Sequence, residues 1–280
     1  MNPWIALSFA ALLLLAAAAP AEYAPVHGLK MYYEIHGQAP EKQPPLVLLH
    51  GGGSTIESSF GRILPELAKS RRIIAVELQA HGRTKDIDRP ETFENDADDV
   101  AELLKQLKID GADFFGFSNG GTTCLQIAIR HPKLVHKLIV ASGAYKRDGF
   151  IPGFFDGFNG ATLQTMPKPL QEAYLKANPG ADGPAGLQKM FDRDVARMVA
   201  FKDIPDEQIK SIAAPTLVIN ADKDVVRVEH ALEMSRAVQH GQLAILPGGH
   251  GEYIGEICSP EPDSKVPALV AAMIVEFVEK

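Results

Sequence analysis

The sequence predicts an α/β protein, in which a mostly parallel, doubly wound sheet carries a helical cap insertion. Short, continuous apolar runs recur along the 280 residues, as in strands that are buried on both faces of a sheet. Amphipathic helical patterns separate most of these runs, and such alternation is typical of parallel sheets with helices on both faces. The alternation stops between about residues 145 and 213. We therefore expect a core of residues 22–144 and 214–280 and a cap of residues 145–213.

The N-terminal stretch predicts a signal peptide over residues 1–21. An uninterrupted run of fifteen residues, mostly Ala and Leu, extends from Ile5 to Ala19. A membrane anchor is the alternative, but a bilayer crossing needs roughly 20 residues. The Ala19-Pro20-Ala21 sequence that follows suits signal peptidase, although no Lys or Arg precedes the run. We expect an exported product, periplasmic or secreted, without stable membrane association after cleavage.

The first strand is expected to begin at Leu29, with no core strand before it. Apolar and polar residues alternate from Leu29 to His36, which favours a half-exposed antiparallel strand at the edge of the sheet. Buried strands are predicted at 46–49, 73–76, 114–117, 138–140, 217–219 and 243–246. Helices are predicted around 94–107, 122–131 and 266–277.

The predicted cap is rich in aromatic and methionine residues. Apolar clefts with few polar groups are the usual form of a small-molecule site, so we expect some of these side chains to line a substrate cleft. Phe154 and Phe155 are the candidate substrate-binding residues that we select, and Phe191 is a further residue expected to line the cleft. The alternative is that the aromatic residues form the cap's own core.

The stretch Gly116-Phe117-Ser118-Asn119-Gly120-Gly121 lies between a predicted strand and a predicted helix. A G-x-S-x-G sequence in this context is a sharp turn whose glycines remove the Cβ atoms that would collide across the bend. The turn exposes the serine hydroxyl, and the helix directs its N-terminal amides toward it. Ser118 is therefore the candidate nucleophile.

A serine nucleophile needs a base and an acid that orients the base. Among nine histidines, His250 follows the last predicted strand in the glycine-rich stretch Pro247 to Gly251. Asp222 and Asp224 follow the penultimate strand. Asp222 comes directly after the strand and is expected to accept amides of its own turn, which leaves Asp224 to reach the His250 ring. Because parallel strands end at one edge of a sheet, we expect these side chains to converge on Ser118.

Backbone amides are expected to form an oxyanion hole beside Ser118. One is that of Asn119, directly after the nucleophile, and the second is that of Gly52, in the loop after the strand at 46–49. Gly51 and Gly53 allow this loop to face the site, and we include both among the candidate substrate-binding residues.

With these motifs, the chain from about Leu29 to Lys280 resembles the α/β-hydrolase fold family, and in particular its cap-bearing serine hydrolases of the esterase and lactonase type. The resemblance matches His50-Gly51-Gly52 to the oxyanion loop, the Gly116 to Gly121 stretch to the nucleophile turn and His250 to the base. It also favours Asp224 as the acid. The family includes esterases, lactonases, C–C bond hydrolases, prolyl aminopeptidases and cofactor-free haloperoxidases.

One loop departs from the family's pattern. Residues Glu77 to Arg83 stand where many relatives have an Asp-x-x-Gly-x-Gly turn. Since this loop borders the cleft in the family, Gln79 and His81 are further candidate substrate-binding residues.

Composition narrows the classes of partner. The net charge of −7, without any basic cluster, argues against nucleic-acid binding. The two cysteines, Cys124 and Cys258, form no metal or redox motif, and their pairing stays open. We expect a small-molecule substrate, no cofactor and no metal, whereas the sequence does not indicate an oligomeric state.

The function expected from these residues is hydrolysis of a carboxylic ester or lactone of a small, partly apolar substrate through an acyl-enzyme. The alternatives within this class are C–C bond or amide hydrolysis and cofactor-free perhydrolysis. A non-catalytic small-molecule receptor on the same fold is the alternative from another class.

Overall fold

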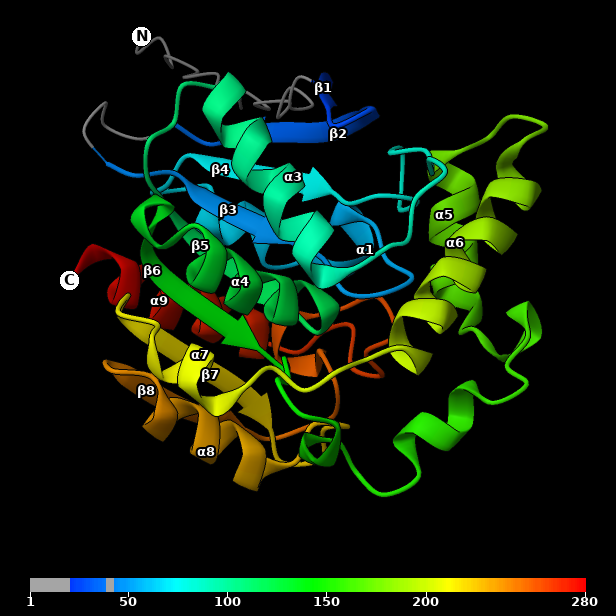
Figure 1. Cartoon of the computed structure of the whole chain (residues 1–280). Coiled ribbons are helices and arrows are strands. Elements are labelled where there is room, and N and C mark those ends of the chain that lie inside the picture. The colour runs from blue at the N-terminus through cyan, green and yellow to red at the C-terminus, as the bar shows by residue number, and fades with distance from the viewer. Residues whose placement is uncertain (1–20, 39–42) are drawn as a thin grey trace, which may run out of the picture.

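The computed structural model describes residues 21–38 and 43–280 and has one eight-stranded sheet in this part of the chain (Figure 1). The strand order is β1-β2-β4-β3-β5-β6-β7-β8. The strands β1 and β2 pair antiparallel, as do β2 and β4, and all other neighbours are parallel. The strands are β1 (Ala21–Val26), β2 (Leu29–His36), β3 (Leu46–Leu49), β4 (Ile73–Glu77), β5 (Ala112–Phe117), β6 (Val135–Ala141), β7 (Thr216–Ala221) and β8 (Gly241–Leu246).

The structure corrects the prediction for the start of the sheet. Strand β1 precedes Leu29 and pairs along its whole length with β2, so β1 is the edge strand and β2 is not. Its side chains Ala24 and Val26 are buried in the core. The predicted signal peptide lies outside the described residues except for Ala21, at which β1 begins.

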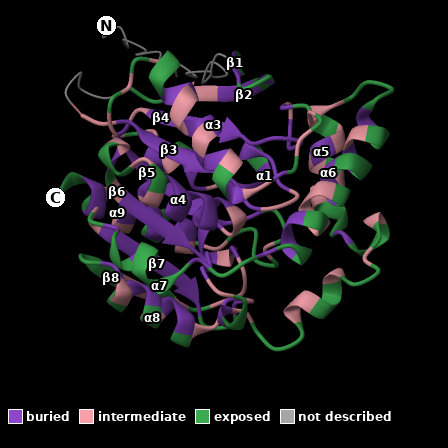
Figure 2. Ribbon diagram, viewed as in Figure 1, coloured by how far each residue is buried: buried purple, intermediate pink, exposed green. Residues whose placement is uncertain are grey.

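Helices cover both faces of the sheet, whose strands are mostly coloured as buried in Figure 2. Buried apolar side chains form a layer on each face. On one face lie α3 (Phe93–Gln106), α4 (Asn119–Arg130) and α8 (Val228–Ala237). On the other face lie α1 (Ile56–Phe60), α2 (Leu64–Leu67) and α9 (Val266–Glu279). The continuous apolar runs of β3 and β5 are fully buried because both of their faces pack on helices.

The segment between β6 and β7 forms the cap. It contains η2 (Arg147–Gly149), η3 (Phe154–Phe158), η4 (Leu163–Thr165), α5 (Lys168–Ala177) and α6 (Gly183–Val199). Its two ends meet where the Ile204 amide donates to the Tyr145 carbonyl oxygen at 2.8 Å. The cap is shorter than predicted at its C-terminal end, because Ile204, Ile209 and Ile212 pack into the core layer of α4 and α8. Helix α7 (Asp206–Lys210) therefore belongs to the core.

Two shorter findings complete the fold. Within the described ranges, none of the helices has the length and apolar character needed to cross a membrane. Both cysteines are free thiols, Cys124 buried in α4 and Cys258 exposed, which answers the question of their pairing.

Candidate active site

The turn after β5 holds Ser118 in an unusual backbone conformation. Its φ of 54° and ψ of −120° lie outside the regions that most residues adopt. A Cβ at Gly116 would collide with the Gly120 carbonyl oxygen, and one at Gly120 would collide with the Leu49 carbonyl oxygen. The sequence therefore permits this bend only with glycine at both positions. Ser118 is also the residue that precedes the first turn of α4.

The structure brings Ser118, His250 and Asp224 into one hydrogen-bonded chain. The Ser118 Oγ lies 3.0 Å from His250 Nε2, and His250 Nδ1 lies 2.7 Å from Asp224 Oδ1. This geometry suits donation from the serine hydroxyl to Nε2 and from Nδ1–H to the carboxylate. The His250 ring packs against Phe117, with ring centroids 4.8 Å apart.

Asp224 is buried and fully hydrogen-bonded, as an orienting acid must be. Its carboxylate also accepts bonds from the Ser142 hydroxyl and the Val226 amide. Burial alone would raise the pKa of Asp224, but the hydrogen bonds from His250 and Ser142 hold it below its usual range. The carboxylate is therefore ionised at neutral pH.

Asp222 lies apart from this chain of hydrogen bonds. Its Oδ1 accepts a bond of 2.8 Å from the Gly248 amide, in the loop that carries His250. We expected it instead to accept amides of its own turn. Asp222 thus joins the loops after β7 and β8.

Two residues that line one cavity with Ser118 have backbone amides for which the described residues offer no acceptor. Within the described part of the chain, neither the Gly52 nor the Asn119 N–H donates a hydrogen bond. Asn119 is the first residue of α4, so its amide has no intrahelical acceptor.

The orientation of the Gly52 amide is fixed by His50. The His50 Nδ1–H donates to the Gly51 carbonyl oxygen at 2.8 Å, and Nε2 accepts from the Leu78 amide at 3.0 Å. Burial, together with the nearby His81, lowers the pKa of His50 to about 3, so the ring is neutral. His50 therefore holds the loop through both of its ring nitrogens.

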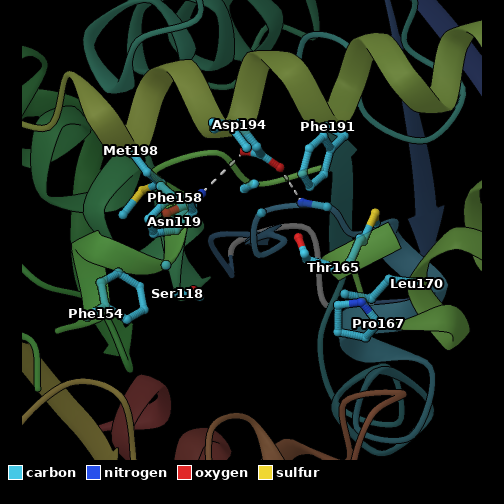
Figure 3. A pocket seen from close by; sticks show the side chains of 16 residues that line it. Ser118, Asn119, Phe154, Phe158, Thr165, Pro167, Leu170, Phe191, Asp194 and Met198 are labelled. Atoms are coloured by element: carbon cyan, nitrogen blue, oxygen red, sulfur yellow. Dashed lines mark hydrogen bonds between the residues drawn. The ribbon is translucent and has the colours of Figure 1, made fainter. Parts of the chain in front are cut away.

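A cavity of about 380 Å³ opens over Ser118, between the core and the cap. Figure 3 shows Phe154, Phe158, Leu170, Phe191 and Met198 around it, with Asn119, Thr165 and Asp194 as polar side chains in its wall. The described residues of the wall include no lysine, arginine or histidine. The cavity is therefore mostly apolar and has one carboxylate.

Comparisons with known proteins agree with this fold. Residues 44–177 match the sequence model of a family described as alpha/beta hydrolase fold. A meta-cleavage product hydrolase from Pseudomonas fluorescens superimposes with a TM-score of 0.73 at 18% identity, covering 94% of this chain and 98% of that one. The chain belongs to the α/β-hydrolase fold family.

Curated relatives of this α/β-hydrolase-fold protein are named hydrolases of several kinds. The human serine hydrolase BPHL is 27% identical over 239 residues, which cover 80% of this chain and 77% of the relative. The putative carbamate hydrolase RutD of Rhizobium rhizogenes is 28% identical over 256 residues, covering 82% and 94%. These names support a hydrolase and leave the bond that it cleaves open.

The structure separates the other candidate substrate-binding residues into two groups. Gly53 and Phe154 line the cavity, whereas Gly51, Gln79, His81 and Phe155 are absent from its described wall. The Gly51 amide donates to Ser59 Oγ behind the loop. Phe155 packs under the Arg147 guanidinium, 3.6 Å from its ring centroid.

Gln79 and His81 are fully buried. Their burial is tolerated because their polar groups form hydrogen bonds within the α/β-hydrolase core and to the cap. Gln79 Nε2 donates to Asp86 Oδ1 at 2.8 Å, and Arg89 Nε donates to Gln79 Oε1 at 2.6 Å. His81 Nδ1 donates to the Gln79 carbonyl oxygen at 2.8 Å. The two side chains stabilise their loop rather than contact a ligand in the cavity.

Sequence reasoning expected aromatic and methionine residues of the cap in the wall, Phe191 among them, but missed Asp194 and Val195. Phe191, Asp194, Val195 and Met198 all come from α6. Their spacing of three and four residues places them on one helix face, and this pattern was the signal that could have found them.

Asp194 belongs to a buried ionic cluster with His81, Glu91, Asp96 and Arg197. Arg197 Nη1 lies 2.7 Å from Glu91 Oε1 and 3.0 Å from Asp96 Oδ2, and Nη2 donates to Asp194. Ligand atoms of His81, Glu91 and Asp194 lie within 4.8 Å of one another, close enough for a metal ion. Arg197 already supplies positive charge to both carboxylates, so a divalent cation would be repelled there.

Proposed function

We propose that this protein is a serine hydrolase that cleaves a carboxylic ester or lactone of a small, partly apolar substrate. The observation that carries the proposal is the hydrogen-bonded chain from Ser118 through His250 to Asp224. The Gly52 and Asn119 amides support it, because neither N–H group donates a hydrogen bond within the described residues and both can bind an oxyanion. The mostly apolar cavity supports an apolar acyl group.

In the proposed reaction, Ser118 Oγ attacks the carbonyl carbon while His250 Nε2 takes the hydroxyl proton. The carbonyl oxygen becomes an oxyanion that accepts hydrogen bonds from the Gly52 and Asn119 amides. The C–O bond to the leaving group then breaks, and His250 donates its proton to the departing alkoxide. A water molecule attacks the acyl-enzyme by the same steps and releases the carboxylic acid. Asp224 holds His250 in the required tautomer throughout.

A substrate panel distinguishes this reaction from its alternatives. The panel contains p-nitrophenyl esters, lactones, aminoacyl amides and a carbon–carbon cleavage substrate that carries a carboxylate. Neutral esters should react fastest, because the described cavity wall offers Asp194 and no cationic side chain to an anion. Preference for the anionic substrate or for amides would replace ester hydrolysis as the reaction.

Labelling with a fluorophosphonate tests the nucleophile. The wild-type protein should be labelled. Ser118→Ala should not be labelled, and its rate of ester hydrolysis should be lower by about 10⁴-fold or more. Ser142→Ala is a matched control for a second hydroxyl, which contacts Asp224 rather than the cavity and should still be labelled. A folded but unreactive wild-type protein would favour the non-catalytic receptor.

Export through a signal peptide over residues 1–21 is also part of the proposal, and it rests on the sequence alone. N-terminal sequencing of the protein recovered outside the cytoplasm should find a start near Ala21. An uncut, membrane-bound form would replace the signal peptide with an anchor.

A further inference from the structure

A carboxylate of the cap reaches both segments that supply the two free amides. Asp194 lies on α6, and its Oδ2 accepts hydrogen bonds from the Gly53 amide and from His81 Nε2, the latter at 2.9 Å. Its Oδ1 lies 3.4 Å from Asn119 Nδ2 and accepts a bond from Arg197. The close view in Figure 3 shows the Asp194 side chain pointing down from α6 toward Asn119 and the oxyanion loop.

These contacts fix the loop on the side opposite to His50. The peptide group before Gly52 is held through the Gly51 carbonyl oxygen by His50, and the peptide group after Gly52 is held through the Gly53 amide by Asp194. A Cβ at Gly52 would lie 2.5 Å from Asn119 Nδ2 and 3.3 Å from each Asp194 carboxylate oxygen. The loop, the nucleophile turn and the cap are therefore in direct contact at this point.

The charge of Asp194 is balanced locally. Its side chain is only 13% exposed, and the buried Arg197 and His81 contact it directly. Arg197 is also paired with Asp96 of α3 and with Glu91, so the helix that carries Asp194 is tied to the core. Two cationic neighbours offset the repulsion that a lone carboxylate would exert on a nearby oxyanion.

The ionisation of the pair is consistent with this arrangement. Burial alone would lower the pKa of His81, but the carboxylates of Asp194 and Glu91 raise it to about 9. Burial alone would raise the pKa of Asp194, but His81 and Arg197 hold it far below its usual range. At neutral pH, the protonated His81 ring therefore donates a hydrogen bond from Nε2 to an ionised Asp194.

We propose that Asp194 is a positioning residue through which the cap orders the oxyanion hole, by holding the Gly53 peptide and Asn119 in place. The inference rests on the proposed function. It makes turnover depend on the position of the cap as well as on the residues of the core. Asp194 acts through Gly52 and Asn119 and forms no bond to the reacting atoms.

The test is Asp194→Asn, measured beside Asp192→Asn as a matched control. Asp192 lies on the same helix, is exposed and bonds to Gln188. In Asp194→Asn we expect kcat to fall by about 10- to 100-fold with KM within about threefold of wild type, because a misplaced donor lowers transition-state stabilisation. Asp192→Asn should change neither constant by more than about twofold.

A transition-state probe separates positioning from a merely structural role. An alkyl trifluoromethyl ketone forms a tetrahedral adduct with a serine, so its affinity should fall in Asp194→Asn by the same factor as kcat. The affinity for the corresponding unreactive methyl ether should stay nearly constant. An unchanged kcat, or a raised KM with kcat intact, would overturn the proposal.

Two further variants keep the outcomes distinct. If Asp194→Asn does not fold, Asp194→Glu retains the charge beside Arg197 but moves the carboxylate from the Gly53 amide, and the same criteria apply to it. If the wild-type protein is neither labelled by fluorophosphonate nor active, the proposed function fails. If wild type is labelled, Ser118→Ala is not, and the Asp194 variants turn over at the wild-type rate, only the role of Asp194 fails.

Discussion

Asp222 and Asp224 are two residues apart, yet their carboxylates bond to different groups. Asp224 contacts His250, whereas Asp222 accepts the Gly248 amide. We therefore predict that Asp224→Asn lowers kcat by up to about 10⁴-fold, because the amide favours the wrong tautomer of His250. Asp222→Asn keeps an oxygen that can accept the Gly248 amide, so its activity should remain within about threefold of wild type.

Steady-state kinetics with one ester substrate checks this pair of variants. Asp222→Ala is the third variant, since it removes the acceptor and loosens the loop that carries His250. Its activity should fall between those of the two asparagine variants. A larger loss in Asp222→Asn than in Asp224→Asn would assign the acid to Asp222.

Individual site residues could be predicted where their backbone conformation requires glycine neighbours, because glycine is visible in the sequence. Ser118 and His250 stand in glycine-rich loops at strand ends, and such loops are visible in the sequence. Gln79 and His81 were selected because their loop borders the cleft, but a sequence does not show into which side of a loop a polar side chain turns. Asp194 shares a helix face with Phe191 and Met198, but its contacts could not be predicted locally, since they come from segments 75 and 141 residues away.

Helix η3 offers a test of which cap residues contact the substrate. Phe154 lines the cavity, and its neighbour Phe155 packs against Arg147 and Phe201 instead. We predict that Phe154→Ala raises kcat/KM for longer acyl chains relative to acetyl by about 10-fold or more, because it enlarges the cavity. Phe155→Ala should leave the chain-length preference within about twofold and act on stability.

The measurement is kcat/KM for p-nitrophenyl esters of increasing chain length, with thermal denaturation of each variant. Equal changes in chain-length preference for Phe154→Ala and Phe155→Ala would contradict the prediction that Phe154, and not Phe155, contacts the acyl chain. Leu163→Ala, in the adjacent η4 and outside the described wall, serves as a second control.

Strand β1 should contribute measurably to the stability of the sheet. Val26 is fully buried and Ala24 nearly so, and β1 pairs with β2 from Ala21 to Val26. Removing residues 1–26 should therefore lower the free energy of unfolding by about 2 kcal/mol or more relative to removing residues 1–20. Urea denaturation of the two truncated proteins gives this difference directly.

Val26→Ala in the longer of these two proteins should reproduce part of the loss. Equal stability of both truncated proteins would mean that β1 is dispensable. If the proposed signal peptide is cut near Ala21, the mature protein keeps Glu22–Val26 and with it most of the strand.

Elements could be predicted where burial on both faces produced continuous apolar runs. This holds for β3 to β7, whose strands have helices on either side. Strand β1 escaped prediction because Pro25 interrupts it and it adjoins the apolar N-terminal run. The end of the cap was misplaced because α7 has the same helical pattern as the cap helices, and only its packing on the core distinguishes it.

For the molecule as a whole, His230 should make stability fall in mild acid. Its ring is fully buried, stacks on Tyr145 and accepts the Tyr145 amide at Nε2, so it is neutral in the folded protein. Burial lowers the pKa of His230 to about 4, with further lowering by Arg227 and Lys146 and opposition from the carboxylates of Asp148 and Asp203. In the unfolded chain the imidazole takes up its proton below about pH 6.5.

The unfolded state therefore binds more protons between about pH 6.5 and 4, and stability falls as the pH falls through this window. The contribution of His230 is full above about pH 6.5 and declines by about 1.4 kcal/mol per pH unit below it. His230→Gln, which cannot titrate, should flatten the pH dependence by that slope, as measured by urea denaturation from pH 4 to 7. The exposed His240→Gln is the control, and an equal slope in wild type and His230→Gln would contradict the prediction.

The closure of the cap at Tyr145 and Ile204 has a consequence for how such a protein can diversify. The two ends of the insertion are joined by a hydrogen bond of 2.8 Å, so to the sheet the whole segment is one surface loop. The entropy of closing a loop grows only slowly with its length, by about 0.6 kcal/mol for each doubling. A recombination that replaces residues 146–203 with a segment of another length would thus leave the sheet and the Ser118–His250–Asp224 geometry intact while exchanging most of the cavity wall. Such an exchange would have to rebuild the contacts of the cap with the core, among them the carboxylate that reaches from the cap to the oxyanion loop.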